Sequence, residues 1–307
     1  MVTKEPSRLL FVVLAVVVVV VAGVGAAVLY EVEKPKGRSS LLTVQEGDNV
    51  TVNYVGEFGS GPQTGRVFDT SVFSVARNNA SYPKSLEYTP RASQASYTPL
   101  AVHVGPNAPA SGYTIGNLSF GTVVTGFWQG LIGLSGNLTT KLTILPQYGY
   151  GALNTSCLRT APLVVSVPVL SFVPASQFAT LYPNVTAQVG AVFPDPTYGW
   201  NDTIFAINTT TVTVQALATV GGTSSPQGLP YLVRSVNTTS ITLASELTPA
   251  NFGSFLGHAA GLGVCGKTQF IINSIELATG SFVENFNPEV QGQTLDFLVT
   301  VVDIFPA

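Results

Sequence analysis

The chain alternates apolar and polar residues over many short segments, and this period of two is typical of half-buried β-strands. Gly, Pro and Asn separate the segments, and helical periodicity is nearly absent. The segments with this pattern are residues 50–58, 99–105, 141–145, 210–220, 268–277 and 295–304. We therefore predict a mostly β fold (α+β) with one short helix near residues 127–134.

The chain between these segments gives a coarse picture of its organisation. Residues 71–98 are rich in Ser, Tyr, Asn and Pro, and we interpret them as an excursion between two strands. No repeat of fixed period stands out. At 307 residues the chain is long enough for two domains with separate cores.

An uncharged apolar stretch covers residues 9–30, after Lys4 and Arg8. Twenty-two residues at a rise of about 1.5 Å can cross the apolar core of a bilayer, about 30 Å thick. We predict a cytoplasmic tip and transmembrane helix over residues 1–30, a linker over 31–40 and a single-pass protein in the cell membrane. A cleaved signal peptide stays open as the alternative, because the small residues at 22–27 resemble a cleavage site.

The asparagines indicate on which side of the membrane the bulk of the chain lies. Nine of the sixteen begin an N-x-[ST] motif, which predicts N-glycosylation and places the bulk of the chain outside the cytoplasm. These acceptors are Asn49, Asn79, Asn117, Asn137, Asn154, Asn184, Asn201, Asn208 and Asn237. A Thr-rich β-protein that produces such motifs incidentally is the alternative. Cys157 and Cys265 form one disulfide in this compartment or are two unrelated buried thiols.

Composition removes several classes of function. Only 9% of residues are charged and 46% are hydrophobic, so the chain is not disordered and has no basic surface for nucleic acid. The two histidines, His103 and His258, lie in no metal-ligand spacing, so we expect no metal. The Gly-rich residues 257–266 lack the Lys-Ser/Thr ending of a phosphate loop, and we expect no cofactor.

Five segments, read in order, carry a family resemblance. They are GDNVTVNYVGEF (47–58), GRVFDTS (65–71), PLAVHVG (99–105), VVTGFWQGLIGLSGN (123–137) and KLTILPQYGYG (141–151). Together they resemble an FKBP-type peptidyl-prolyl cis-trans isomerase. Their order and spacing from Pro99 to Gly151 match the family, apart from a longer connection at residues 106–122.

A sixth segment points to one branch of the family. NFNPEVQGQTLDF (285–297) resembles the segment that precedes the last strand in SlyD-like and archaeal long FKBPs, which carry an insert-in-flap chaperone domain. The resemblance implies an antiparallel half-barrel wrapped on a short helix, built from residues 41–151 and 286–307. A β-rich, chaperone-like domain at residues 152–285 interrupts it. This insert looks larger than the family's and matches it poorly inside, so only its position is carried over.

The implied activity needs an apolar pocket and no covalent step. An X-Pro bond isomerises over a barrier of about 18 to 20 kcal/mol, through a twisted amide that has lost its resonance. A water-poor pocket with aromatic walls favours this twisted state over the planar, well-solvated one. The implied partners are unfolded or proline-containing polypeptides, and the sequence indicates neither their identity nor the oligomeric state.

The resemblance also implies the site residues. The catalytic set is Tyr54, Phe68, Asp69, Phe127, Tyr150 and Phe297, and the substrate-binding set is Leu100, Val123 and Val124. Phe127 is expected under the proline ring, where the family often has Trp, and Leu100 replaces an aromatic residue. The Tyr150 hydroxyl is expected to hold the carbonyl before the proline. Asp69 is expected to order a polar neighbour or the twisted peptide.

Other interpretations stay open. The three phenylalanines of this set are core residues of a β-barrel in the plainer interpretation, and Asp69 is then a turn residue. A non-catalytic FKBP-like scaffold that binds unfolded chains or a membrane partner is the alternative function. A structural surface-layer or adhesin component also fits the low charge, but it leaves the ordered segments unexplained.

Overall fold

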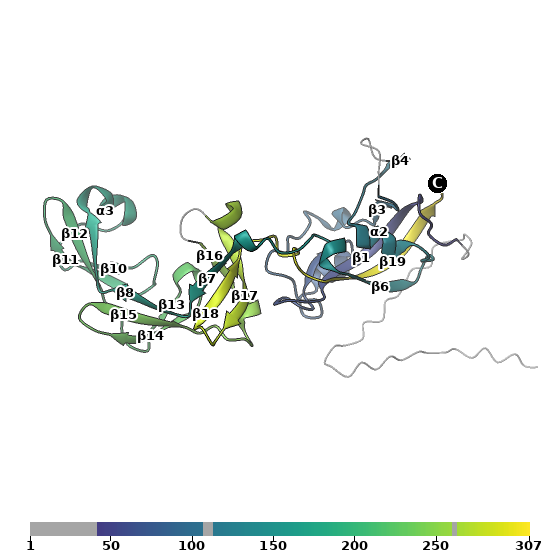
Figure 1. Ribbon diagram of the computed structural model, residues 1–307. Helices are drawn as coiled ribbons and strands as arrows, with labels where there is room; N and C mark the ends of the chain where they lie inside the picture. The colour runs from purple at the N-terminus through teal and green to yellow at the C-terminus, as the bar shows by residue number, and fades with distance from the viewer. Residues whose placement is uncertain (1–41, 107–112, 260–262) are drawn as a thin grey trace, which may run out of the picture. The chain divides into compact units, whose positions relative to one another are not determined.

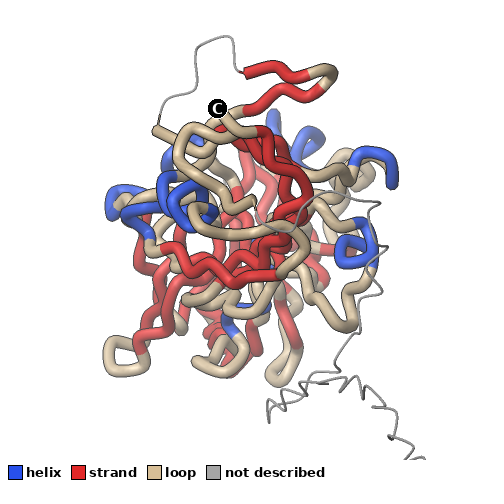
Figure 2. Tube along the Cα trace, turned by 90° about the vertical axis from the view of Figure 1, so that its right-hand side faces the viewer, coloured by secondary structure: helices blue, strands red, loops and turns tan. Residues whose placement is uncertain are grey.

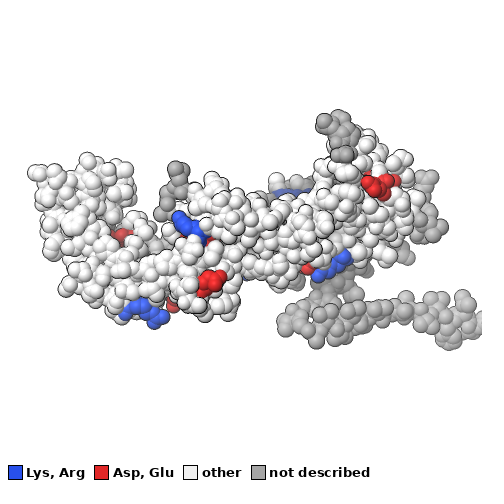
Figure 3. Space-filling model, viewed as in Figure 1, with Lys and Arg blue, Asp and Glu red and all other residues white. Residues whose placement is uncertain are grey.

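The computed structural model describes residues 42–106, 113–259 and 263–307 (Figure 1). This part of the chain is mostly β, as predicted, and strands dominate the trace in Figure 2. Its α-helices are short: α1 (Phe73–Arg77), α2 (Thr125–Leu131) and α3 (Ala175–Leu181). Charged side chains are sparse on the face shown in Figure 3, in keeping with the composition.

An antiparallel five-stranded sheet contains both the first and the last strand. Its members are β1 (Asn49–Phe58), β2 (Val67–Thr70), β3 (Leu100–His103), β6 (Thr139–Ile144) and β19 (Leu295–Phe305). The order is β2-β1-β19-β6, and β3 pairs with β1. β1 and β19 lie side by side along their whole length, from Asn49 opposite Phe305 to Phe58 opposite Leu295 (Figure 1). The strands predicted at residues 50–58, 99–105, 141–145 and 295–304 are confirmed as β1, β3, β6 and β19.

Helix α2 packs on this sheet through Phe127, Trp128 and Leu131, all buried. Its glycines allow a close approach: a Cβ on Gly126 would lie 2.6 Å from a methyl carbon of Ile144. The helix begins two residues before the predicted range and ends three residues before its end. The early end has a local reason, because Gly133 has a φ of +84°, which an α-helix does not accept.

Residues 71–98 lie between β2 and β3, as predicted, and contain no named strand. This excursion holds α1 and the 3₁₀ turn Gln94–Ser96. Lys84 organises it from inside, because its Nζ donates to the carbonyl oxygens of Val75 at 2.9 Å, Asn78 at 3.3 Å and Tyr82. The segment also pairs with β2 at one point, because Val67 donates to the Pro83 carbonyl at 2.8 Å and accepts from Ser85 N at 2.9 Å.

Residues 158–285 form three four-stranded sheets, with orders β10-β11-β12-β9, β13-β14-β15-β8 and β16-β17-β18-β7. Their strands are β7 (Leu158–Pro162), β8 (Val164–Pro168), β9 (Leu170–Pro174), β10 (Val192–Pro194), β11 (Asn201–Ile207), β12 (Thr211–Ala216), β13 (Thr223–Ser224), β14 (Tyr231–Val236), β15 (Ser240–Ser245), β16 (Leu256–His258), β17 (Gln269–Glu276) and β18 (Ser281–Asn285). In the described residues these strands pair only with one another.

The three sheets repeat one design, which sequence reasoning missed. Strands β7, β8 and β9 follow one another directly, and each ends in a proline. These prolines are spaced six residues apart, at Pro162, Pro168 and Pro174. These prolines pair with Ser281, Ser240 and Thr211, the first position of the returning strand in each sheet. Each hairpin also shows a register shift near the middle of its first strand. The chain thus first forms the three edge strands and then three hairpins that pair with them in reverse order. The first hairpin pairs with β9, the second with β8 and the third with β7.

Two residues of this run connect neighbouring sheets. Leu163 donates its N–H to Gly280 at 2.8 Å and accepts from Ser245 at 2.7 Å. Val169 does the same one step later, donating to Thr239 at 3.0 Å and accepting from Ala216 at 2.9 Å. The backbone therefore passes from sheet to sheet without losing its hydrogen bonds.

A disulfide joins Cys157 to Cys265, so of the two alternatives the structure contains the paired one. No helix within residues 42–106, 113–259 and 263–307 has the length and apolar character needed to span a bilayer. The predicted span over residues 9–30, the tip before it and the linker 31–40 lie outside the described residues.

Candidate functional site

One pocket of about 390 Å³ contains all nine residues that the resemblance implied. Strands β1, β2, β3 and β19 supply Tyr54, Phe68, Asp69, Leu100 and Phe297. The remaining members precede α2, lie on it or follow the 3₁₀ turn Pro146–Tyr148: Val123, Val124, Phe127 and Tyr150. Thr122 also lines the pocket. Sequence reasoning did not single out Thr122, although it directly precedes Val123.

Aromatic rings meeting edge to face build the walls of the pocket. The Phe127 ring is 5.0 Å from that of Phe297 at an interplanar angle of 80°, and Phe68 meets Phe297 at 5.4 Å and 88°. Phe127 is only 2% exposed. A Cβ at Gly56 would lie 2.7 Å from the Phe68 ring, so the glycine lets this ring approach β1 closely. The result is a close-packed apolar surface.

A polar cluster borders this apolar surface. The Tyr54 hydroxyl donates to Asp69, and Arg91 Nη2 donates to the Tyr54 hydroxyl at 3.1 Å. The Arg91 guanidinium is also 3.6 Å from the Asp69 carboxylate. Desolvation, followed by the Asp69 charge, raises the pKa of Tyr54 well above its usual range, and Arg91 opposes the shift. Tyr54 is therefore protonated at neutral pH and acts as a donor.

Sequence reasoning missed Arg91. It lies in the excursion, in a segment without periodicity, and no local signal connects it with Asp69 on β2. Asp69 accepts from the hydroxyl of Tyr54, and its role in the site stays a prediction.

Tyr150 presents a hydroxyl at the pocket. Its side chain is 49% exposed, and within the described residues its hydroxyl has no hydrogen-bond partner. Desolvation and the Asp69 carboxylate raise the pKa of Tyr150. The group is therefore neutral at physiological pH and is available to donate to a carbonyl oxygen.

A small hairpin, β4 (Tyr113–Ile115) and β5 (Leu118–Phe120), leads into the pocket segment. It occupies part of the long connection noted in the sequence. The Tyr113 ring stacks on His103 with 4.4 Å between centroids, and Phe120 meets Phe305 at 5.5 Å. His103 Nδ1 lies 3.1 Å from Asn49 Oδ1. Among the described residues no group of three or more His, Cys, Asp or Glu is placed to hold a metal ion.

The predicted glycosylation sites differ in their surroundings. Asn49 is a correction to the sequence interpretation: it lies in β1, is 6% exposed and contacts His103, so a glycan on its amide would have no room in the folded sheet. The other eight asparagines are exposed.

Three of these exposed asparagines have a structural role as well. The side-chain oxygens of Asn154, Asn208 and Asn237 accept from the backbone N–H two residues later, at 3.1, 2.9 and 2.9 Å. The Ser or Thr at that position contacts the same oxygen through its hydroxyl. The N-x-[ST] pattern therefore also encodes turns at these places, two of them at hairpin tips.

Comparison with known proteins gives a match over part of the chain. No protein-family model matches this sequence. A short-type peptidyl-prolyl cis-trans isomerase of Methanocaldococcus jannaschii is 29% identical over 132 residues. The match covers 43% of this chain and spans 62% of that relative's length.

Proposed function

We propose that this chain is an FKBP-type peptidyl-prolyl cis-trans isomerase. One observation carries the proposal: the nine residues implied by separate segments of the sequence line a single aromatic pocket. The archaeal relative supports an isomerase or protein-folding role in general terms. Proline-containing polypeptides are the substrates that follow.

The pocket favours the twisted amide over the planar one. The rings of Phe127 and Phe297 exclude water around the proline ring, and a twisted amide loses less solvation there than a planar, more polar one. The Tyr150 hydroxyl is placed to hold the preceding carbonyl oxygen. Asp69 and Tyr54, tied to Arg91, keep the polar edge rigid. Rotation about the X-Pro bond breaks no covalent bond, so the proposal assigns no acid or base.

A tetrapeptide assay on the purified chain tests this directly. We expect the rate of X-Pro isomerisation to rise linearly with the concentration of the folded protein. Folded protein that leaves the uncatalysed rate unchanged would contradict the proposal and favour the scaffold.

The finer proposal is the SlyD-like arrangement: an FKBP half-barrel over residues 41–151 and 286–307, with a chaperone-like domain inserted at 152–285. The sheets divide the strands in the same way. The two connections also lie against each other: Asn154 N donates to Asn287 Oδ1 at 3.0 Å, and Gly292 N donates to the Gly151 carbonyl at 2.8 Å. An insert whose ends meet can be added to a domain without opening it.

The alternative, a non-catalytic scaffold that binds unfolded chains, has an observation of its own. The sheet β10-β11-β12-β9 has one buried and one exposed side, and Phe172, Val192 and Phe205 are 70%, 60% and 57% exposed. Monomeric proteins rarely expose several large apolar side chains in one region. In the finer proposal the same residues contact unfolded clients, and the isomerase assay separates the two functions.

We also propose that residues 31–307 lie outside the cytoplasm, held by one N-terminal span. The Cys157–Cys265 disulfide supports an oxidising compartment, and the eight exposed asparagines are compatible with glycosylation. Protease added to intact cells should degrade this portion. Full protection, with all of these asparagines unmodified, would contradict the topology.

A further inference from the structure

A buried carboxylate lies in the segment between β18 and β19, outside the pocket. Glu289 is 7% exposed. It accepts three hydrogen bonds: from Gln63 Nε2 at 2.9 Å, from Ser85 Oγ at 2.6 Å and from the backbone N–H of Glu87 at 3.1 Å. Two of these donors belong to the excursion between β2 and β3.

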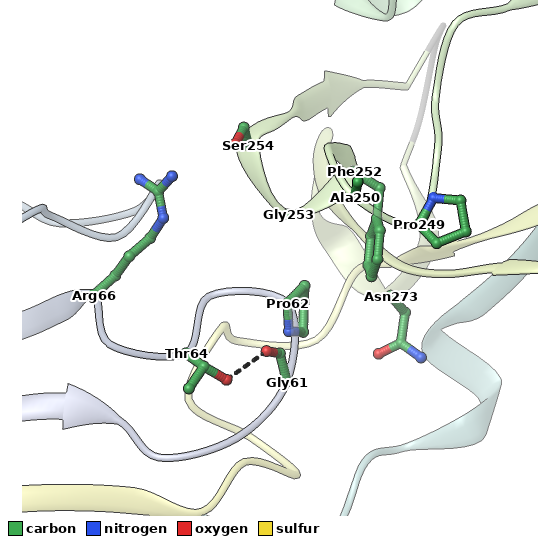
Figure 4. A pocket seen from close by; sticks show the side chains of 10 residues that line it. All are labelled: Gly61, Pro62, Thr64, Arg66, Pro249, Ala250, Phe252, Gly253, Ser254 and Asn273. Atoms are coloured by element: carbon green, nitrogen blue, oxygen red, sulfur yellow. Dashed lines mark hydrogen bonds between the residues drawn. The ribbon is translucent and has the colours of Figure 1, made fainter. Parts of the chain in front are cut away.

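A neighbouring side chain completes the attachment. Gln63 is 2% exposed, and its Oε1 accepts from the N–H of Leu86 at 2.7 Å. It lies in the turn after β1, where Thr64 Oγ1 donates to the Gly61 carbonyl at 2.7 Å (Figure 4). Gly61 has a φ of +80°, and a Cβ there would lie 2.0 Å from Gln293 Oε1, so this turn packs on the same returning segment.

The choice of donors is informative. Within the described residues Glu289 has no cation as an ion-pair partner, and it is satisfied by neutral donors alone. Burying a carboxylate is costly unless hydrogen bonds replace its water. Since the Glu289 carboxylate needs its hydrogen bonds to Ser85 and Glu87, these bonds hold residues 85–87 in place.

That path leads to the pocket. Four residues after Glu87, the backbone N–H of Arg91 donates to the Tyr97 hydroxyl at 2.9 Å, and its Nη1 donates to the Ser96 carbonyl at 3.1 Å. The guanidinium is then fixed where Nη2 contacts Tyr54 and pairs with Asp69. The backbone from Glu87 to Arg91 therefore joins the contacts of Glu289 to the contacts at the polar edge of the pocket.

We propose that Glu289 is a positioning residue for the proline pocket, which acts by holding the excursion so that Arg91 fixes Tyr54 and Asp69. This rests on the proposed isomerase function. Glu289 itself contacts neither the pocket nor the substrate. Its effect on catalysis passes through Arg91.

The experiment is a double-mutant cycle on the full chain. Arg91→Ala is expected to lower kcat/KM about five- to tenfold, and Glu289→Ala about three- to fivefold, within the range of the net contribution of an ordinary hydrogen bond. In the Arg91→Ala background, Glu289→Ala should add no further loss. Glu289→Gln should keep activity within about twofold, because an amide can accept both N–H groups and donate to Ser85.

A second readout does not depend on activity. The ¹⁵N side-chain signal of Arg91, assigned by its loss in Arg91→Ala, should shift in Glu289→Ala and in Ser85→Ala. It should not shift in Gln291→Ala, a matched control in the same segment whose side chain contacts the Ala152 carbonyl instead. Ser85→Ala serves if Glu289→Ala fails to fold, since it removes only one bond and leaves the carboxylate in place.

The outcomes are distinct. An unchanged Arg91 signal in Glu289→Ala and Ser85→Ala overturns the positioning role, whether or not the chain is an isomerase. Additive losses of activity in the cycle overturn it as well. A wild-type chain without isomerase activity contradicts the proposed function, and a shifted Arg91 signal would then still support the structural link.

Discussion

Tyr148 and Tyr150 are two residues apart and equally exposed, at 49%, but only Tyr150 lines the pocket. This makes them a matched pair. Tyr150→Phe removes one hydrogen bond, worth about 0.5 to 1.5 kcal/mol, and should lower kcat/KM by a few-fold to about tenfold. Tyr148→Phe should leave it unchanged. Equal effects in the tetrapeptide assay would remove Tyr150 from the site.

Phe127 should matter more, since Phe127→Ala empties the floor of the pocket and admits water. We expect a loss in kcat/KM of well over tenfold, checked at a temperature where the variant is folded. Leu131→Ala, in the same helix and also buried, controls for lost stability because Leu131 does not line the pocket. Asp69→Leu should fall between the substitutions of Tyr150 and Phe127. If Leu131→Ala and Phe127→Ala lower activity equally, Phe127 is only a core residue.

Asp202 predicts a pH dependence of stability. Its side chain is 3% exposed, and burial, followed by the charge of Asp195, raises the pKa of Asp202 from 3.8 to about 7. Tyr182 and Tyr198 also face these carboxylates. Because the folded state holds the proton more tightly, this stabilisation is complete below about pH 4 and is lost as the pH rises through about 7.

Urea unfolding at pH 5 and pH 8 measures this effect. Each unit of pKa difference is worth about 1.4 kcal/mol, so the wild-type protein should lose up to a few kcal/mol between these values. Asp202→Asn should show a much smaller loss. Trp200 reports it by fluorescence once the other tryptophan is removed by Trp128→Phe. The same pH slope in both proteins would rule out Asp202 as its source.

At the scale of elements, three consecutive strands stand at sheet edges: β7, β8 and β9 are each the terminal strand of one of the three four-stranded sheets. Leu163 and Val169 point their backbone groups at the hairpins, so by alternation the even-numbered residues of the run, which include all three prolines, point theirs at the free edge. The prolines at 162, 168 and 174 therefore lack an N–H where a foreign strand would pair. This is a known means of preventing edge-to-edge association.

Replacing these three prolines with Val restores the missing donors. We expect the triple variant to self-associate more than wild type at equal concentration, measured by light scattering after size-exclusion chromatography. Pro226→Ala, in the 3₁₀ turn Pro226–Gly228, is the control because it lies off this edge. A triple variant that elutes like wild type would show that the prolines have no such role.

At the scale of the whole molecule, the proposed division of the chain predicts separable activities. Replacing residues 152–285 by a short Gly-Ser loop should keep tetrapeptide isomerisation within about twofold, because the pocket draws no residue from them. Catalysis of the refolding of a proline-limited protein should fall much more, since the proposed client-binding surface is gone. Equal losses in both assays would mean that the insert belongs to the catalytic fold.

The sequence by itself determined the β character, the main strands and the composition of the pocket. The strands follow from local alternation, which places Tyr54 and Phe297 on the same side of the sheet. The pocket residues follow from the resemblance of separate segments to one family. The segments that carry the resemblance contain both the residues and the spacing between them. Nine lining residues could therefore be named before their distances were known.

Only the tertiary structure decided what depends on contacts between distant segments. Arg91 and Glu289 lie in segments without periodicity, so their roles appear only when the excursion and the returning segment are in place. The threefold repeat was hidden because its hairpins are unequally spaced, and it is defined by pairs such as Pro162 with Ser281. Asn49 fits a glycosylation motif in the sequence, but pairing of β1 with β3 and β19 buries it. A local motif specifies a residue's chemistry, whereas its surroundings come from strands far away in the chain.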